Sequence, residues 1–171
     1  MLEENSNYRK IAFIDRDGVI NKKPAEQHYV LNINEFIIND GIFSLLKTLK
    51  ADGFEFIIVT NQRGIARGLF NEDDLKKIHD FLRNELIREN IEILDIFYCP
   101  HNNNECDCRK PSPGLLNQAC LKYNIDIKQS IIVSDTKEDT AMGEKFGLKA
   151  SFLVPVDKPE EIIETYKNTI E

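Results

Sequence analysis

The chain has 171 residues, of which 42% are hydrophobic and 30% are charged, the balance of a globular protein with a core of its own. Twenty-two basic residues against twenty-nine acidic ones give a net charge of −7, which argues against non-specific binding to nucleic acid or to an anionic membrane. No stretch approaches the ~20 apolar residues that cross a bilayer, and the polar start lacks the pattern of a signal peptide. We expect a single domain over residues 1–171, acting in the cytoplasm as a monomer.

Apolar runs and amphipathic stretches alternate along the whole chain. Strands are predicted at 10–14, 54–59, 93–98, 131–133 and 151–154. Helices are predicted from the stripes at 42–49, 75–86, 115–123 and 141–146, with a polar closing helix from about residue 159. This alternation is typical of an α/β fold with a doubly wound, Rossmann-like parallel sheet and helices on both faces. No large insertion follows the first strand, so we expect no cap domain.

Polar residues follow the predicted strands and should meet, because ligands of such sheets bind beyond the carboxyl ends of the strands. Grouped carboxylates with room for water favour Mg²⁺, whereas a hydroxyl and positive charges suit a phosphoryl group. Together they indicate phosphoryl transfer through an aspartyl phosphate. The residues concerned are Asp15 and Asp17 after the first strand, Thr60 and Asn61 after the second, Arg109 and Lys110 beyond the third, and Asp135, with Glu138 and Asp139 just beyond, after the fourth.

Each of these motifs taken alone is more often a turn, a helix cap or a surface segment; their joint placement at strand ends favours a site. A signalling receiver domain also combines a parallel sheet with acidic residues, a Thr and a Lys. A receiver, however, keeps its acidic pair on the first strand and its phosphoacceptor on the third, where this chain has cysteines. A zinc-based nucleic-acid module is disfavoured by the net charge of −7.

Four segments carry a resemblance to a known family: FIDRDGVIN (13–21), VTNQRGIARG (59–68), CPHNNNECDCRKPSPG (99–114) and VSDTKED (133–139). They resemble the four motif regions of the haloacid dehalogenase superfamily of phosphatases, and most closely its histidinol-phosphate and D-glycero-D-manno-heptose 1,7-bisphosphate phosphatase branch. The resemblance implies a haloacid dehalogenase-type sheet without a cap. It also implies that Asp15 is the nucleophile and a Mg²⁺ ligand, and that Asp17 is the general acid/base and offers Mg²⁺ its backbone carbonyl.

The remaining roles follow from the same resemblance. Thr60, Asn61 and Lys110 would hold the phosphoryl group, Arg109 would contact the rest of the substrate, and Asp135 would complete the magnesium site. The chain departs from the family pattern at three positions, namely Val19 in place of Thr, Ser134 in place of Gly, and Thr136 in place of Lys or Arg. The departures at Ser134 and Thr136 leave open how this chain holds the magnesium side and the substrate side of the site.

Three of the four cysteines fall within ten residues. Cys99 and His101, followed by Cys106 and Cys108, offer three thiolates and an imidazole, a complete tetrahedral set for structural zinc. Free thiols are the alternative, since a disulfide between Cys106 and Cys108 would be strained. Members of the family carry the same Cys-x-His and Cys-x-Cys pairs. The two other histidines, His28 and His79, are expected at the surface.

The predicted substrate is a small phosphorylated sugar. The segment RKPSPG at 109–114 is similar to the heptose-bisphosphatase version of this stretch. The short interval between His101 and Cys106 is closer to that of the histidinol phosphatases. We favour conversion of D-glycero-D-manno-heptose 1,7-bisphosphate to heptose 1-phosphate, a step of carbohydrate metabolism toward lipopolysaccharide precursors. Histidinol phosphate is the alternative substrate.

Overall fold

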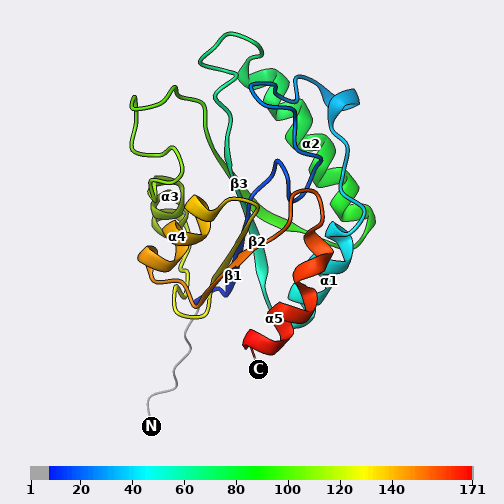
Figure 1. Ribbon diagram of the computed structural model, residues 1–171, viewed down its shortest axis with the longest axis vertical. Coiled ribbons are helices and arrows are strands. Elements are labelled where there is room, and N and C mark those ends of the chain that lie inside the picture. Colours follow the sequence, from blue (N-terminus) through cyan, green and yellow to red (C-terminus); the bar gives the residue numbers. More distant parts are fainter. Residues whose placement is uncertain (1–7, 171) are drawn as a thin grey trace.

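A computed structural model describes residues 8–170 and places a parallel sheet at the centre of the molecule (Figure 1). All four pairs of neighbouring strands run parallel. The strand prediction is confirmed to within two residues at every end. The order across the sheet is β3-β2-β1-β4-β5, with β1 at Ile11–Ile14, β2 at Glu55–Asn61, β3 at Ile93–Cys99, β4 at Ile131–Ser134 and β5 at Ala150–Leu153.

Helices connect the strands in the predicted order. The best-marked start is that of α2, where Asn71 and Asp74 form a reciprocal capping box and acidic residues fill the first turn. The helices are α1 (Ile42–Ala51), α2 (Glu72–Arg88), α3 (Gly114–Lys122), α4 (Lys137–Phe146) and α5 (Ile163–Ile170), with short 3₁₀ helices η1 (Ile33–Glu35) and η2 (Pro159–Ile162).

Side chains of the central strand alternate between two hydrophobic clusters, one on each face of the sheet. Ala12 and Ile14 belong to a cluster shared with α1, α2 and α5. Ile11 and Phe13 belong to a second cluster, shared with α3 and α4. Figure 1 shows the two groups of helices on opposite sides of the strands. Because both faces of the sheet are covered, the central strand is apolar along its whole length, and the doubly wound α/β prediction is confirmed.

The strand order reverses beside β1. The chain moves from β1 outward to β2 and β3, and then crosses to β4 and β5 on the other side of β1. Connections that leave β1 and β4 therefore diverge, which opens a crevice beyond their carboxyl ends. The connection from β1 to α1, residues 15–41, contains only η1, and no cap domain is present in it.

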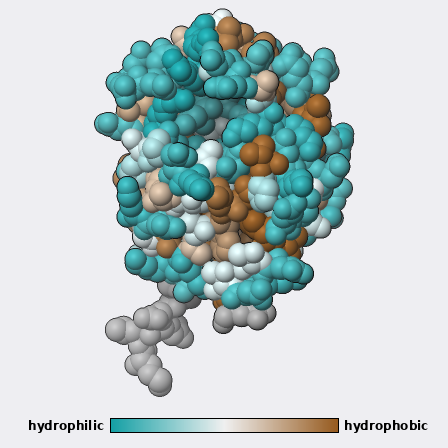
Figure 2. All heavy atoms as spheres, in the orientation of Figure 1, coloured by the Kyte–Doolittle hydropathy of each residue, from teal (hydrophilic) through white to brown (hydrophobic). Residues whose placement is uncertain are grey.

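The face of the molecule drawn in Figure 2 is mainly polar. On the face drawn in Figure 2, hydrophilic residues predominate and hydrophobic ones gather in small patches. Among the helices of residues 8–170, none combines the length and the apolar character needed to cross a bilayer.

Candidate active site

The polar ends of three central strands meet at one edge of the sheet, and a cavity of about 410 Å³ opens there. Its lining contains every residue predicted to bind the magnesium ion or the phosphoryl group, although these residues come from four separate stretches of the chain. They are Asp15, Asp17, Thr60, Asn61, Arg109, Lys110 and Asp135.

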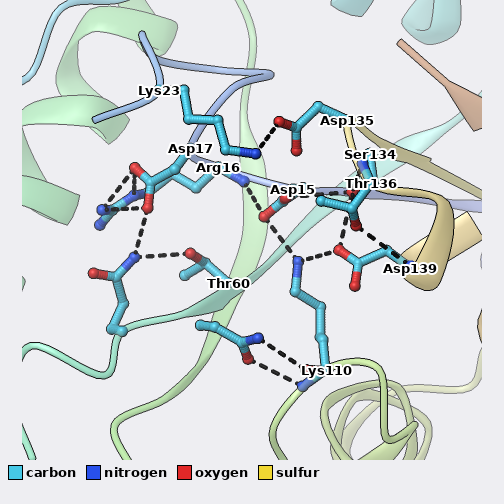
Figure 3. A network of polar contacts seen from close by, with 12 residues as sticks. Asp15, Arg16, Asp17, Lys23, Thr60, Lys110, Ser134, Asp135, Thr136 and Asp139 are labelled. Carbon is cyan, nitrogen blue, oxygen red and sulfur yellow. Dashed lines mark hydrogen bonds and ion pairs between the residues drawn. The ribbon is translucent and has the colours of Figure 1, made fainter. Parts of the chain in front are cut away.

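Asp15 lies at the centre of this arrangement, directly after β1, and is buried (Figure 3). One carboxylate oxygen accepts a hydrogen bond from the backbone of Arg16 at 2.8 Å and pairs with the Lys110 ammonium at 2.8 Å. The other lies 3.3 Å from the Ser134 hydroxyl oxygen. Burial raises the pKa of Asp15 to about 6; neighbouring carboxylates add to the rise, and Lys110 opposes it. The carboxylate that a nucleophile requires therefore still predominates at neutral pH.

Asp17 is held by hydrogen bonds from three side chains. Its oxygens accept from the Arg16 guanidinium at 3.0 Å, from the Asn21 amide at 2.9 Å and from the Gln62 amide at 3.1 Å. Burial alone would raise the pKa of Asp17, but the charge of Arg16 and these hydrogen bonds outweigh it and hold the pKa below its usual range. The arrangement thus stabilises the base form of the predicted acid/base.

The end of β2 contributes Thr60 and Asn61, each with a bonded side chain. The Thr60 hydroxyl accepts from Gln62 at 2.8 Å, so one glutamine amide links the predicted acid/base to the predicted phosphate ligand. The Asn61 amide exchanges two bonds of 3.0 Å with the backbone of Lys110. Asn61 therefore anchors the main chain of Lys110, a contact that sequence reasoning did not include; its predicted contact with phosphate stays a prediction.

Lys110 is buried between two carboxylates. Its ammonium lies 2.8 Å from Asp15 and 2.6 Å from Asp139. Burial would lower the pKa of Lys110, but the two carboxylates outweigh this effect and raise it above its usual value. The ammonium is therefore charged at neutral pH and directed at Asp15, the predicted nucleophile.

Asp139 is a residue whose role sequence reasoning missed, since the sequence marked it only as an acidic neighbour of the fourth strand. It is buried and accepts a bond from the Ser134 hydroxyl at 2.9 Å, in addition to its pair with Lys110. The Thr136 side chain caps α4 by accepting from the Asp139 backbone at 3.4 Å. Ser134 and Thr136, two of the positions that depart from the family pattern, thus connect Asp139 to the end of β4 by hydrogen bonds. The available signal was the cap position, because the first helical turn after Thr136 directs residue 139 back toward the sheet.

The opposite side of the cavity fits a metal ion. One oxygen of Asp135 is buried without a hydrogen-bond partner among the described residues, and the other contacts the ammonium of Lys23. Gly18 has a φ of +93°, and a Cβ there would lie 2.4 Å from the Asp135 carboxylate. The chain therefore needs glycine at this position. An unpaired buried carboxylate oxygen near the carboxylate of Asp15 is a donor set of the kind that Mg²⁺ prefers.

The four predicted zinc ligands converge in the connection between β3 and α3. We call them the cysteine cluster: Cys99, His101, Cys106 and Cys108. Their ligand atoms all lie within 4.8 Å of one another, and four of the separations measure 3.3–3.6 Å. Bonds of ~2.3 Å at tetrahedral angles place sulfurs about 3.8 Å apart, whereas a disulfide bond is about 2.05 Å long. The cluster fits a closed tetrahedral zinc site and not a disulfide.

The cysteine cluster is joined directly to the active-site cavity. Cys108 precedes Arg109 and Lys110, both of which line the cavity. One guanidinium nitrogen of Arg109 is buried without a partner among the described residues, so it is free to bind an anion. A Cβ at Gly114, the first residue of α3, would lie 2.5 Å from the Cα of Cys108. The loop is therefore packed tightly against the start of α3.

The expectation for one histidine was wrong. His79 was expected at the surface, because its helix is rich in charge, but it is buried and lies 3.2 Å from the guanidinium of Arg16. His28 is exposed, as expected. Helix α2 directs its apolar stripe at the sheet, and His79 follows Ile78 on that side. The sequence pattern shows the stripe but not the buried guanidinium that meets it.

Comparisons with known proteins agree with this geometry. A family model described as polynucleotide kinase 3 phosphatase matches residues 10–149. The chain is 44% identical over 161 residues to D-glycero-alpha-D-manno-heptose-1,7-bisphosphate 7-phosphatase from Photorhabdus laumondii, which covers 90% of this chain and 86% of that protein. It is 39% identical over 158 residues to D-glycero-beta-D-manno-heptose-1,7-bisphosphate 7-phosphatase from Pasteurella multocida, with 88% and 84% covered.

A solved structure is similar as well. The crystal structure of D,D-heptose 1,7-bisphosphate phosphatase from B. bronchiseptica, complexed with magnesium and phosphate, superimposes with a TM-score of 0.79 at 30% identity. The match covers 91% of this chain and 86% of that chain.

Proposed function

This chain belongs to the haloacid dehalogenase superfamily of phosphatases, in the branch of the heptose-bisphosphate phosphatases, and from this membership we propose that it hydrolyses D-glycero-D-manno-heptose 1,7-bisphosphate to heptose 1-phosphate and inorganic phosphate. It is thus a phosphoric monoester hydrolase. The observation that carries the proposal is the pairing of the buried Asp15 carboxylate with the Lys110 ammonium at 2.8 Å in a cavity lined by further carboxylates.

The first chemical step forms a phosphoenzyme. A carboxylate oxygen of Asp15 attacks phosphorus, and the bond between phosphorus and the C7 oxygen breaks. Asp17 gives a proton to the departing alkoxide. The negative charge of a phosphate bound beside Asp17 would oppose the lowering of its pKa and so favour the protonated form. Lys110, Thr60 and Arg109 offer positive charge and hydrogen bonds to the phosphoryl oxygens and the rest of the substrate.

The second step returns the enzyme to its starting state. Water attacks phosphorus of the aspartyl phosphate, the bond to the Asp15 oxygen breaks, and inorganic phosphate leaves. Asp17 takes a proton from the attacking water and thereby regains the proton that it gave in the first step. The hydrogen bonds from Arg16, Asn21 and Gln62 favour the carboxylate form of Asp17 that this step requires.

Two metal ions complete the proposal. Asp15, the backbone carbonyl of Asp17 and Asp135 would hold Mg²⁺, which when bound neutralises charge on the phosphoryl oxygens. The unpaired oxygen of Asp135 supports this assignment. The cysteine cluster would hold Zn²⁺ in a structural role, since its four ligands leave no open position for substrate.

A parallel assay of purified protein tests the proposed substrate. Phosphate release is measured from the alpha and beta anomers of the heptose 1,7-bisphosphate and from histidinol phosphate, each with Mg²⁺. We expect kcat/KM to be highest for one of the two heptose bisphosphates. A preference for histidinol phosphate would overturn the substrate, and a lack of phosphate release from all three would overturn the proposed activity.

A further inference from the structure

Arg16 is a fully buried cation beneath the active site, with an exposed fraction of 0%. Its Nε and Nη2 donate to the Asp17 carboxylate at 3.2 and 3.0 Å. Its Nη1 points the other way, to Nε2 of His79 at 3.2 Å. A buried charge is tolerated only when its hydrogen bonds are made, so the guanidinium depends on partners on both sides.

His79 can form a hydrogen bond with Nη1 of Arg16 in only one way. Guanidinium nitrogens have no acceptor capacity, so Nε2 of His79 must accept, and the imidazole must be neutral. The pKa of His79 agrees with this requirement. Burial and then the charge of Arg16 lower it to about 3, while Asp17 and Asp80 oppose the fall and Arg83 adds to it. The imidazole also packs edge-on against the Tyr98 ring, with the ring centres 6.0 Å apart, which restrains the plane of the imidazole.

We propose that His79 is a positioning residue for Asp17 and acts through Arg16. The imidazole anchors one end of the guanidinium, and the opposite edge of the guanidinium then holds the Asp17 carboxylate in place. His79 is not among the residues that line the cavity, so its effect on the reaction passes through Arg16. The inference rests on the proposed function, in which Asp17 protonates the leaving group. Small misplacements of such a group cost as much as ~10²-fold in rate.

Two substitutions separate the hydrogen bond from the packing. His79→Leu fills the space but offers Arg16 no acceptor, whereas the side-chain oxygen of His79→Gln accepts from about the position of Nε2. Leu82→Ala is the matched control, because Leu82 is buried one turn further along α2 and its truncation destabilises the same helix. Melting temperature and circular dichroism verify that each variant is folded.

The readout is the rate of the first turnover on two substrates. The leaving group of the heptose bisphosphate is a sugar alkoxide, which needs the proton of Asp17. The leaving group of p-nitrophenyl phosphate is a stabilised phenolate, which does not need it. We expect His79→Leu to lower the ratio of the two rates, heptose over aryl, by ~10-fold or more, part of the ~10²–10⁴-fold contribution of a general acid. KM for the heptose bisphosphate should stay within about twofold, because phosphate binding does not involve His79.

The outcomes are distinct. Restoration of the ratio by His79→Gln, with an unchanged ratio in Leu82→Ala, supports the proposal. An unchanged ratio in His79→Leu overturns it, as does a fall in His79→Gln equal to that in His79→Leu, because the accepted hydrogen bond would then not matter. A wild-type protein that releases phosphate from neither substrate would refute the proposed function instead.

Discussion

The active-site carboxylates and the cysteine cluster are both candidate metal sites, but the chain supports them in different ways. Asp15 and Asp135 follow the buried strands β1 and β4 and contact the ammonium groups of Lys110 and Lys23, so protein groups satisfy much of their charge without a metal. The cysteine cluster lies largely in residues 100–113, which contain no helix or strand, and its ligand atoms contact chiefly one another. A site built on the sheet keeps its shape without its ion, whereas a site built on a loop depends on it.

The largest expected effect is on turnover at the first of these sites. Asp15→Asn removes the attacking carboxylate oxygen but keeps its shape, and Lys110 keeps Asp139 as a partner. We expect phosphate release to fall below detection while circular dichroism and a cooperative thermal melt show that the protein remains folded. The measurement is a steady-state phosphate assay beside a thermal melt. Near-normal phosphate release would refute Asp15 as the nucleophile.

Removal of magnesium should lower activity nearly as much as Asp15→Asn does, and it should leave the stability of the fold almost unchanged. Few protein ligands would hold the ion, so it should exchange readily, and the ammonium groups of Lys110 and Lys23 neutralise Asp15 and Asp135 in its absence. Dialysis into metal-free buffer, which removes the weakly held Mg²⁺ and leaves the tightly held zinc, followed by a brief assay, should abolish activity, and added Mg²⁺ should restore it. The comparison between the two sites would fail if the same treatment left activity intact, or if loss of Mg²⁺ alone unfolded the protein.

Loss of a cysteine ligand should act in the opposite manner, on stability as well as on rate. We expect Cys106→Ala or Cys108→Ala to lower the melting temperature and to reduce kcat/KM by as much as ~10²-fold, because Arg109 and Lys110 follow the cluster directly. Cys120→Ala is the control, since Cys120 packs against the second hydrophobic cluster and is not a ligand. Elemental analysis should find zinc in the wild type and in Cys120→Ala. A zinc-free wild type with unchanged melting temperature and turnover would contradict the structural role of zinc.

A smaller effect tests the charge balance around Lys110. Asp139→Asn keeps the shape of the side chain but removes one of the two negative charges that face the ammonium. We expect a loss of stability of about 2 kcal/mol, as for other buried charge-assisted hydrogen bonds, together with a lower kcat. Glu144→Gln, an exposed substitution on the same helix, should change neither quantity. Equal urea midpoints for Asp139→Asn and Glu144→Gln would show that Asp139 does not stabilise Lys110.

The last expected effect, which appears only below neutral pH, is the pH dependence of stability due to His79. Its folded pKa of about 3 lies below the ordinary value of 6.5, so below pH 6.5 the unfolded chain binds a proton that the folded chain does not. Stability therefore falls as the pH falls through this window, by about 2 kcal/mol between pH 7 and pH 5 from this one group. His79→Gln cannot titrate and should lose this part of the dependence. Parallel unfolding curves at both pH values measure the difference; identical pH dependence in the two proteins would mean that His79 is not buried as a neutral group.

Much of the architecture follows from local patterns in the sequence. Continuous apolar runs predict strands buried on both faces, and the stripe of Ile42, Leu45, Leu46 and Leu49 predicts a helix whose four apolar residues are all buried in α1. The rule that parallel strands present their carboxyl ends together then places Asp15 and Asp135 in one cavity. The ligand spacing of the cysteine cluster was equally informative, because the two ligands of a Cys-x-His or Cys-x-Cys pair lie only two residues apart and are therefore close in space in any fold.

The sequence by itself thus determined the sheet, the strand ends that carry the carboxylates, and the cysteine cluster, since each depends on residues near one another in the chain or on a general rule of topology. Only the tertiary structure decided the partners of the buried charges. That Asp139 shares Lys110 with Asp15, that Asn61 anchors the Lys110 backbone, and that His79 meets Arg16 are contacts between distant segments. Such contacts form because a buried polar group must be satisfied by whichever neighbour the packing brings within hydrogen-bond distance, and no periodicity along the chain specifies that neighbour.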